Sequence, residues 1–200
     1  MTARCCLEEV NFMNKLLSKN EGYNFIKEEK FRIAAMLPQY CNDGKDISEI
    51  ILVDNTTVLA KISISTLLSK YAREFSYTIE GLQSYYQEEL EQSIVSYPIS
   101  HNILLVPLRT RTTNKKQHKA YGRVNFYCVN GTRTIPGKGL HLIINGSKEI
   151  KLNQGKNTTK KALLTGIAAG QHSRINYNSP CNCCDPYPEF RHYKTIKLEK

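Results

Sequence analysis

The alternation of hydrophobic and polar positions in the first half of the chain predicts a mixture of helices and strands. Apolar residues at helical spacing indicate an amphipathic helix at residues 7–19, with acids early and lysines late. An apolar run at residues 31–40 predicts a strand that stops at Pro38, and residues 47–65 contain two strand patterns around an Asp-Asn turn, which favours a hairpin. From residue 65 to 75 the apolar positions recur every 3.6 residues, so the pattern changes to a helix.

The middle of the chain predicts a further helix and then two more strands. Residues 78–97 are acidic and contain an internal glycine, so they indicate a helix or a long connection, which Pro98 ends. Residues 101–107 form a continuous apolar strand closed by Pro107. A second strand is expected at residues 121–131, where apolar side chains alternate with polar ones.

A hairpin and a final helix are predicted near the end of the apolar pattern. Residues 140–152 hold two strand-like arms around Asn145-Gly146, a pair that suits a type I′ turn because both central residues need positive φ. Residues 157–174 begin with Asn157 or Thr158 as a helix cap. The positions that we expect to face the core of this helix are Ala162, Leu163, Ile167 and Ala168.

These elements together predict an α+β fold with a mostly antiparallel sheet and a few helices. A chain of 200 residues with 40% apolar content is long enough to bury a core. We expect an N-terminal helical extension at residues 1–30, a domain at residues 31–178, and a tail rich in cysteine and proline at residues 179–200.

The net charge of +10 is distributed very unevenly along the chain. Residues 1–100 hold 10 Lys and Arg against 14 Asp and Glu, whereas residues 101–200 hold 18 against 4. Between residues 101 and 161 Glu149 is the one acidic residue. Such a field attracts polyanions, because neutralising phosphates releases their condensed counterions. Nucleic acid is therefore the first candidate partner and an anionic membrane surface the second; a charge that only maintains solubility is the alternative.

The segment between the two central strands, residues 108–123, carries six positive charges and no acid. Its threonine, asparagine and glutamine side chains can donate to phosphates, and arginines on an extended loop can enter the narrow minor groove of AT-rich DNA. The first candidate DNA contacts are Arg109, Arg111, Lys115, Lys116, Lys119 and Arg123. The second candidate contacts, from the hairpin and the start of the final helix, are Lys148, Lys151, Lys156, Lys160 and Lys161.

Lysines at the beginning of a helix oppose its dipole unless an anion lies between them, so the last three of these residues indicate a phosphate contact. A solvated basic turn explains the same three lysines equally well. No helix-turn-helix, zinc finger or basic zipper pattern is present in the sequence, so we expect a strand and a loop to contact DNA rather than a helix in the major groove.

Catalytic and metal chemistry find little support in the sequence. The basic half offers almost no carboxylates for phosphodiester hydrolysis. Cys181, Cys183, Cys184 and His192 could supply zinc ligands, but the Cys-x-Cys-Cys spacing is not that of a standard zinc knuckle. We therefore expect no enzyme, no catalytic residue, no metal ligand and no cofactor. No segment is long and apolar enough to span a membrane or serve as a signal peptide, so we expect a cytoplasmic protein with reduced cysteines.

The order of the segments resembles the competence transcription factor (ComK) family. The similar features are an apolar strand ending in Leu-Pro, a strand hairpin, a helical segment, an apolar strand ending in proline before a threonine-rich loop, and an Asn-Gly hairpin that leads into a final helix. They cover about residues 31–172, and each motif is short, so their order and spacing carry the resemblance.

The resemblance implies a cytoplasmic transcriptional activator that binds paired AT-rich sites through the minor groove as a homo-oligomer. It also implies that the activator switches on genes for DNA uptake and is controlled by an adaptor protein that directs its proteolysis. We accordingly expect a partner in double-stranded DNA and no membrane partner. The rival is an RNA-binding or ribosome-associated basic protein, and behind it a metal-dependent enzyme that acts on nucleic acid.

Overall fold

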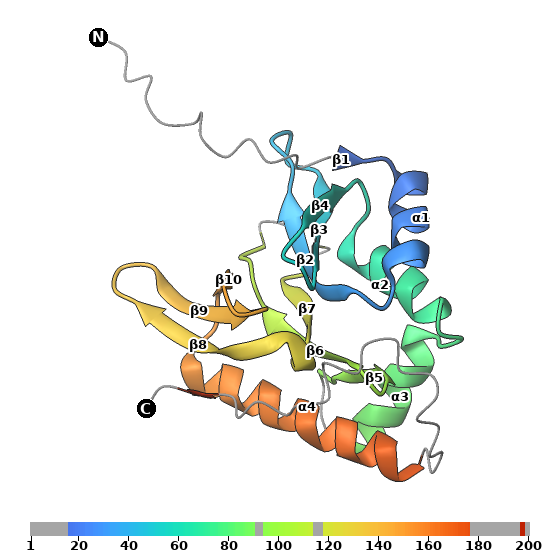
Figure 1. Cartoon of the computed structure of the whole chain (residues 1–200), viewed down its shortest axis with the longest axis vertical. Coiled ribbons are helices and arrows are strands. Elements are labelled where there is room, and N and C mark those ends of the chain that lie inside the picture. The colour runs from blue at the N-terminus through green and yellow to red at the C-terminus, as the bar shows by residue number, and fades with distance from the viewer. Residues whose placement is uncertain (1–15, 91–93, 114–117, 177–196, 199–200) are drawn as a thin grey trace.

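A seven-stranded sheet forms the centre of the computed structural model, which describes residues 16–90, 94–113, 118–176 and 197–198 (Figure 1). Neighbouring strands run antiparallel except for the edge pair β1–β4, which is parallel. The spatial order is β1 (Leu16–Leu17), β4 (Thr57–Ala60), β3 (Asp46–Leu52), β2 (Ile33–Tyr40), β7 (Tyr121–Asn125), β6 (Ile103–Arg109) and β5 (Tyr97–Ser100).

A smaller sheet of four strands packs beside the first. Its order is β10 (Lys148–Leu152), β9 (Gly139–Ile144), β8 (Val129–Ile135) and β11 (Lys197–Leu198), with β11 parallel to β8. The predicted Asn-Gly hairpin is confirmed: Asn145 and Gly146 have φ of 48° and 80°, as a type I′ turn requires. The α+β class with a mostly antiparallel sheet is likewise confirmed.

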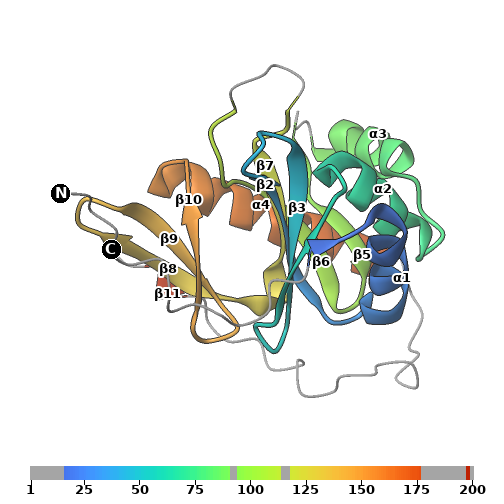
Figure 2. The same ribbon diagram turned by 90° about the horizontal axis from the view of Figure 1, so that it is seen from above.

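Helices cover both faces of the seven-stranded sheet (Figure 2). The helices are α1 (Lys19–Glu29), α2 (Ile64–Arg73), α3 (Ile79–Leu90) and α4 (Lys156–Asn176). Helices α1 to α3 pack on one face, where Ile26 and Tyr71 share a core with Met36 of β2. The smaller sheet and α4 pack on the other face, where Leu142 and Leu163 join the core around Val106. The seven-stranded sheet therefore lies between two layers.

The structure corrects the predicted N-terminal helix. Residues 7–15 lie outside the described part of the chain, while Leu16 and Leu17 form strand β1. Helix α1 starts after Ser18. The side chains of Ser18 and Glu21 form a capping box at this start. The prediction followed the apolar periodicity of residues 7–19 and did not use this local signal. Leu17 and Ile26 are buried in the same core as β2, so residues 16–30 pack as part of the main body.

Three prolines do not end their elements as predicted. Pro38 lies inside β2 opposite Ser48, Pro107 lies inside β6 opposite Arg123, and Pro98 lies within β5. The φ of proline, fixed at about −65°, is compatible with the β region, and the residue lacks only one N–H donor. A strand therefore continues through it where the neighbouring strand does not need that donor.

The predicted strand at residues 121–131 is in fact two strands that belong to different sheets. A short 3₁₀ helix, η1 (Phe126–Cys128), separates β7 from β8. The side chain of Asn125 holds this corner: its Oδ1 accepts from the backbone N–H groups of Leu104 and Tyr127, and its Nδ2 donates to the carbonyl of Asn102. The chain changes sheet here because a buried asparagine satisfies the backbone groups that a continuous ladder would have paired.

Candidate nucleic-acid interface

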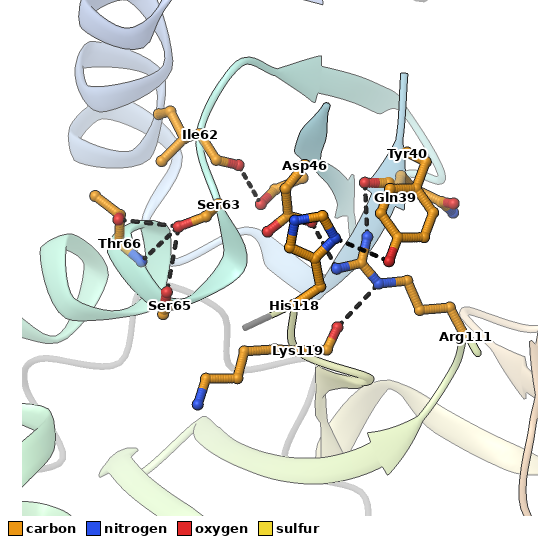
Figure 3. Close-up of polar contacts among 11 residues, drawn as sticks. Gln39, Tyr40, Asp46, Ile62, Ser63, Ser65, Thr66, Arg111, His118 and Lys119 are labelled. Carbon is orange, nitrogen blue, oxygen red and sulfur yellow. Dashed lines mark hydrogen bonds and ion pairs between the residues drawn. The ribbon is translucent and has the colours of Figure 1, made fainter. Parts of the chain in front are cut away.

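Arg111, in the connection between β6 and β7, is a structural anchor rather than an exposed contact (Figure 3). Its guanidinium donates to Asp46 Oδ1 at 2.6 Å, to the carbonyl of Gln39 at 2.8 Å and to the carbonyl of Lys119 at 2.9 Å. The guanidinium carbon lies 4.1 Å from the centre of the Tyr40 ring, and the Arg111 side chain is 8% exposed. All three types of N–H group on this arginine are therefore used inside the protein.

This placement removes Arg111 from the candidate DNA contacts. The first residue of β3, Asp46, lies 65 positions earlier in the chain, and the pairing of β2 with both β3 and β7 brings it to the loop. His118, at the far side of the loop, has Nδ1 3.0 Å from the hydroxyl of Tyr40. The base of the loop is thus held by an ion pair and by an aromatic ring.

Arg123 is also used inside the protein. One guanidinium nitrogen donates to the carbonyl of Val95 at 2.7 Å, and the guanidinium carbon lies 4.2 Å from the centre of the Tyr97 ring. Burial lowers the pKa of the Arg123 guanidinium, because removal from water penalises its charged form. Of the three arginines predicted to contact DNA, only Arg109 is exposed.

Arg109 connects the two predicted sets of basic residues. Its backbone N–H donates to Gln154 Oε1 at 2.8 Å, and its carbonyl accepts from the backbone N–H of Asn153 at 2.7 Å. Gln154 in turn donates to the hydroxyl of Thr159 in α4. The end of β6 and the beginning of α4 are consequently fastened together, although about 45 residues separate them in the sequence.

The remaining candidates are placed differently from one another. Lys119, Lys151, Lys160 and Lys161 are exposed, and Lys156 is half-buried. Lys148 differs from them: it is half-buried and its Nζ lies 3.1 Å from Thr57 Oγ1, where the β9–β10 turn meets the β3–β4 turn. Lys115 and Lys116 lie outside the described residues, as do the cysteines and histidine proposed for zinc.

Glu149, the one acid between residues 101 and 161, is compensated by its neighbours. Arg133 donates to its Oε1, and His141 Nδ1 lies 3.3 Å from its Oε2. Arg133, His141 and Lys151 are direct cross-strand partners on β8, β9 and β10. Because residues directly opposite on neighbouring strands project to the same side, the outer face of the small sheet keeps a net positive charge beside Glu149.

Of the four positions predicted to face the core in α4, only Leu163 is buried, and Ala162 is half-buried; the helix also has an exposed face that the sequence analysis did not identify. Leu163 is buried as expected, but Ala168 is exposed and Ile167 is only half-buried. The exposed positions recur at helical spacing on the side away from the sheets. The sequence contains the signal for this face, because positions outside the apolar stripe of an amphipathic helix face away from the core.

A pocket of about 440 Å³ lies elsewhere, between α3, β5 and the far end of α4. Tyr77, Tyr85 and Tyr86 line it together with serine, threonine, glycine, leucine and proline side chains, so its described lining carries no charged group. Within the described residues, no three side chains of the metal-binding types come together, and no helix is long and apolar enough to cross a bilayer.

Comparisons of the chain with models of protein families, with curated proteins and with solved structures returned no match.

Proposed function

We propose that the protein binds double-stranded DNA and activates transcription. The observation that carries the proposal is the basic surface at one end of the molecule, where hydrogen bonds hold the end of β6 against the beginning of α4. Arg109, Lys160 and Lys161 are exposed there, and the first turn of α4 contains no acid. A cluster of cations without carboxylates is the electrostatic signature of phosphate binding.

The regulated process and the assembly are proposed from the family resemblance. They are activation of genes for DNA uptake, recognition of AT-rich sites through the minor groove and action as a homo-oligomer on paired sites. Regulation by a proteolytic adaptor belongs to the same resemblance. Sedimentation of the protein with and without a duplex that carries two sites tests the oligomer directly.

The proposed function is tested by measuring affinity for an AT-rich duplex, a GC-rich duplex and a structured RNA at the same ionic strengths. We expect the AT-rich duplex to bind most tightly. With three exposed cations on this surface, Arg109, Lys160 and Lys161, the logarithm of the binding constant should fall with the logarithm of salt concentration with a slope of about −2.7. Equal affinity for all three nucleic acids would remove the transcription-factor proposal, and a preference for the RNA would favour the RNA-binding alternative.

A further inference from the structure

Two pockets meet in a recess between α3, β5 and the far end of α4 (Figure 1). The larger pocket has a volume of about 440 Å³ and the smaller one a volume of about 230 Å³. They share the lining residues Tyr77, Pro98 and Ser173, so they form one continuous recess. Sites for small molecules usually have volumes of roughly 300–1,000 Å³, so the recess has the size of such a site.

Aromatic rings form much of the wall of this recess, which we call the tyrosine pocket. Tyr77, Tyr85 and Tyr86 line its larger part, and Tyr127 lines its smaller part. The ring centroids of Tyr85 and Tyr86 lie 4.9 Å apart with the rings at 90°, the edge-to-face arrangement that aromatic pairs prefer. Tyr86 is buried in the core, whereas Tyr85 is 44% exposed. An aromatic ring that is open to water beside a recess offers apolar surface for a ligand to cover.

The walls of the tyrosine pocket are fixed by contacts within the protein. The hydroxyl of Tyr85 lies 2.9 Å from Nε2 of His172, which joins α3 to α4. The backbone N–H of Tyr77 donates to the carbonyl of Ala72 and closes the end of α2. Ser76, which also lines the pocket, has φ of 64° in this connection, and strained backbone of this kind gathers at ligand sites. A wall that is already ordered costs little conformational entropy when a ligand binds.

The chemistry of the lining selects an uncharged ligand. Ser76, Thr78 and Ser173 add hydroxyl side chains to the larger part, and His101 lines the smaller part. The described lining of both parts contains no lysine, arginine, aspartate or glutamate. A charged group would therefore lose its water without gaining a counter-ion. Hydroxyl groups both donate and accept hydrogen bonds, so they suit neutral polar substituents.

We propose that the tyrosine pocket binds a small uncharged molecule with a planar aromatic ring system. The tyrosine rings pack against the faces and edges of that molecule, and the hydroxyl groups orient its polar substituents. Nucleotides and other phosphorylated ligands are excluded, because the described lining supplies no cation for a buried phosphate. The pocket lies near the end of α4, whereas Lys160 and Lys161 lie near its beginning, so this site is separate from the proposed DNA-binding surface.

Fluorescence titration of the full-length protein with N-phenyl-1-naphthylamine tests this inference in the absence of DNA. The probe is uncharged and aromatic, and its emission rises when it enters an apolar site. We expect saturable binding of one probe molecule per chain. A titration without saturable binding would overturn the proposal and would leave the DNA-binding proposal untouched.

Substitutions of Tyr85 locate the bound probe. Tyr85→Ala removes part of the wall and should lower the affinity for the probe by about tenfold, because an aromatic contact is lost. Tyr85→Phe keeps the ring and should change the affinity by about twofold or less. The matched control Tyr121→Ala removes another exposed tyrosine, on β7 opposite Arg109, and should leave the affinity unchanged. Equal affinities of Tyr85→Ala and the wild-type protein would show that the probe binds elsewhere.

Backbone amide NMR spectra of the wild-type protein locate the probe without any substitution, so the test stands even if Tyr85→Ala does not fold. The amide signals of Gly81 and Gly170, which line the two parts of the pocket, should shift when the probe is added. Those of Gly137 and Gly146, in the turns of the smaller sheet, should not. Shifts confined to the turn glycines would overturn the assignment to the pocket.

Competition between two naphthalene derivatives of similar size tests the preference for an uncharged ligand. At neutral pH 2-naphthol is uncharged, whereas 2-naphthoate is an anion. We expect 2-naphthol to displace the probe, and 2-naphthoate to need a concentration about tenfold higher or more, because its carboxylate has no cation beside it in the pocket. Equal displacement by the two compounds would overturn the assignment of an uncharged ligand.

Discussion

Replacing Arg111 with alanine tests whether this arginine stabilises the fold instead of contacting DNA. The substitution removes the ion pair with Asp46, two hydrogen bonds to the carbonyls of Gln39 and Lys119, and the stacking of the guanidinium on Tyr40. It leaves the carboxylate of Asp46 without its cation in a site where that side chain is 17% exposed.

The magnitude follows from the burial of the pair. Removing one partner of a buried ion pair costs about 3–5 kcal/mol, because the other charge stays uncompensated. The partial exposure of Asp46 lets water reach its carboxylate, so we expect a loss near the lower limit, about 3 kcal/mol. For a chain of this size that corresponds to a fall in Tm of about 6–12 °C.

Urea unfolding followed by far-UV circular dichroism measures this loss, since the chain contains no tryptophan for a fluorescence assay. Arg109→Ala, two residues away at an exposed position, is the matched control and should change stability by about 0.5 kcal/mol or less. Asp46→Asn with Arg111→Ala should cost less than the sum of the two single substitutions, because both remove the same interaction. A loss below about 1 kcal/mol for Arg111→Ala would refute the anchoring role.

Two further predictions concern a strained residue and a buried thiol. Ser76 follows α2 with φ of 64°, a conformation that favours glycine, so Ser76→Gly should raise the free energy of unfolding by about 0.5–1 kcal/mol. The control Ser65→Gly, within α2, should not raise it, and a destabilised Ser76→Gly protein would contradict the strain argument. Burial raises the pKa of the Cys128 thiol to about 12, so at pH 8 this thiol stays protonated and unreactive. Iodoacetamide labelling with peptide mapping should leave Cys128 unmodified in the native protein and modify it in urea; rapid native labelling would show that the site opens readily.

The local elements of this fold were largely predictable because their signals lie within a few residues of one another. The hairpin at Asn145-Gly146, the helix that follows Ser63 and the long final helix all appear where periodicity and turn residues indicate them. Two of the misplaced boundaries share a cause. Whether a strand continues through Pro38 or ends at Asn125 depends on which backbone groups of neighbouring strands need partners, and a single sequence does not show this.

The candidate interface was likewise predictable from the sequence only in part. The scarcity of acids around the basic residues is a property of composition, so the sequence alone identified that region of the chain as the candidate for binding polyanions. Whether each basic side chain is exposed or buried depends on tertiary contacts. Arg109 and Arg111 are two residues apart in one segment, yet the first is exposed and the second is buried against Asp46.

The sequence by itself determined most of the secondary elements, the α+β class and the uneven distribution of charge, because these depend on local periodicity and on residue counts. Only the tertiary structure decided which basic side chains make internal contacts and which remain exposed. It also decided that the end of β6 lies against the beginning of α4. The physical reason is that burial and pairing arise from strand register and helix packing, which bring together residues tens of positions apart.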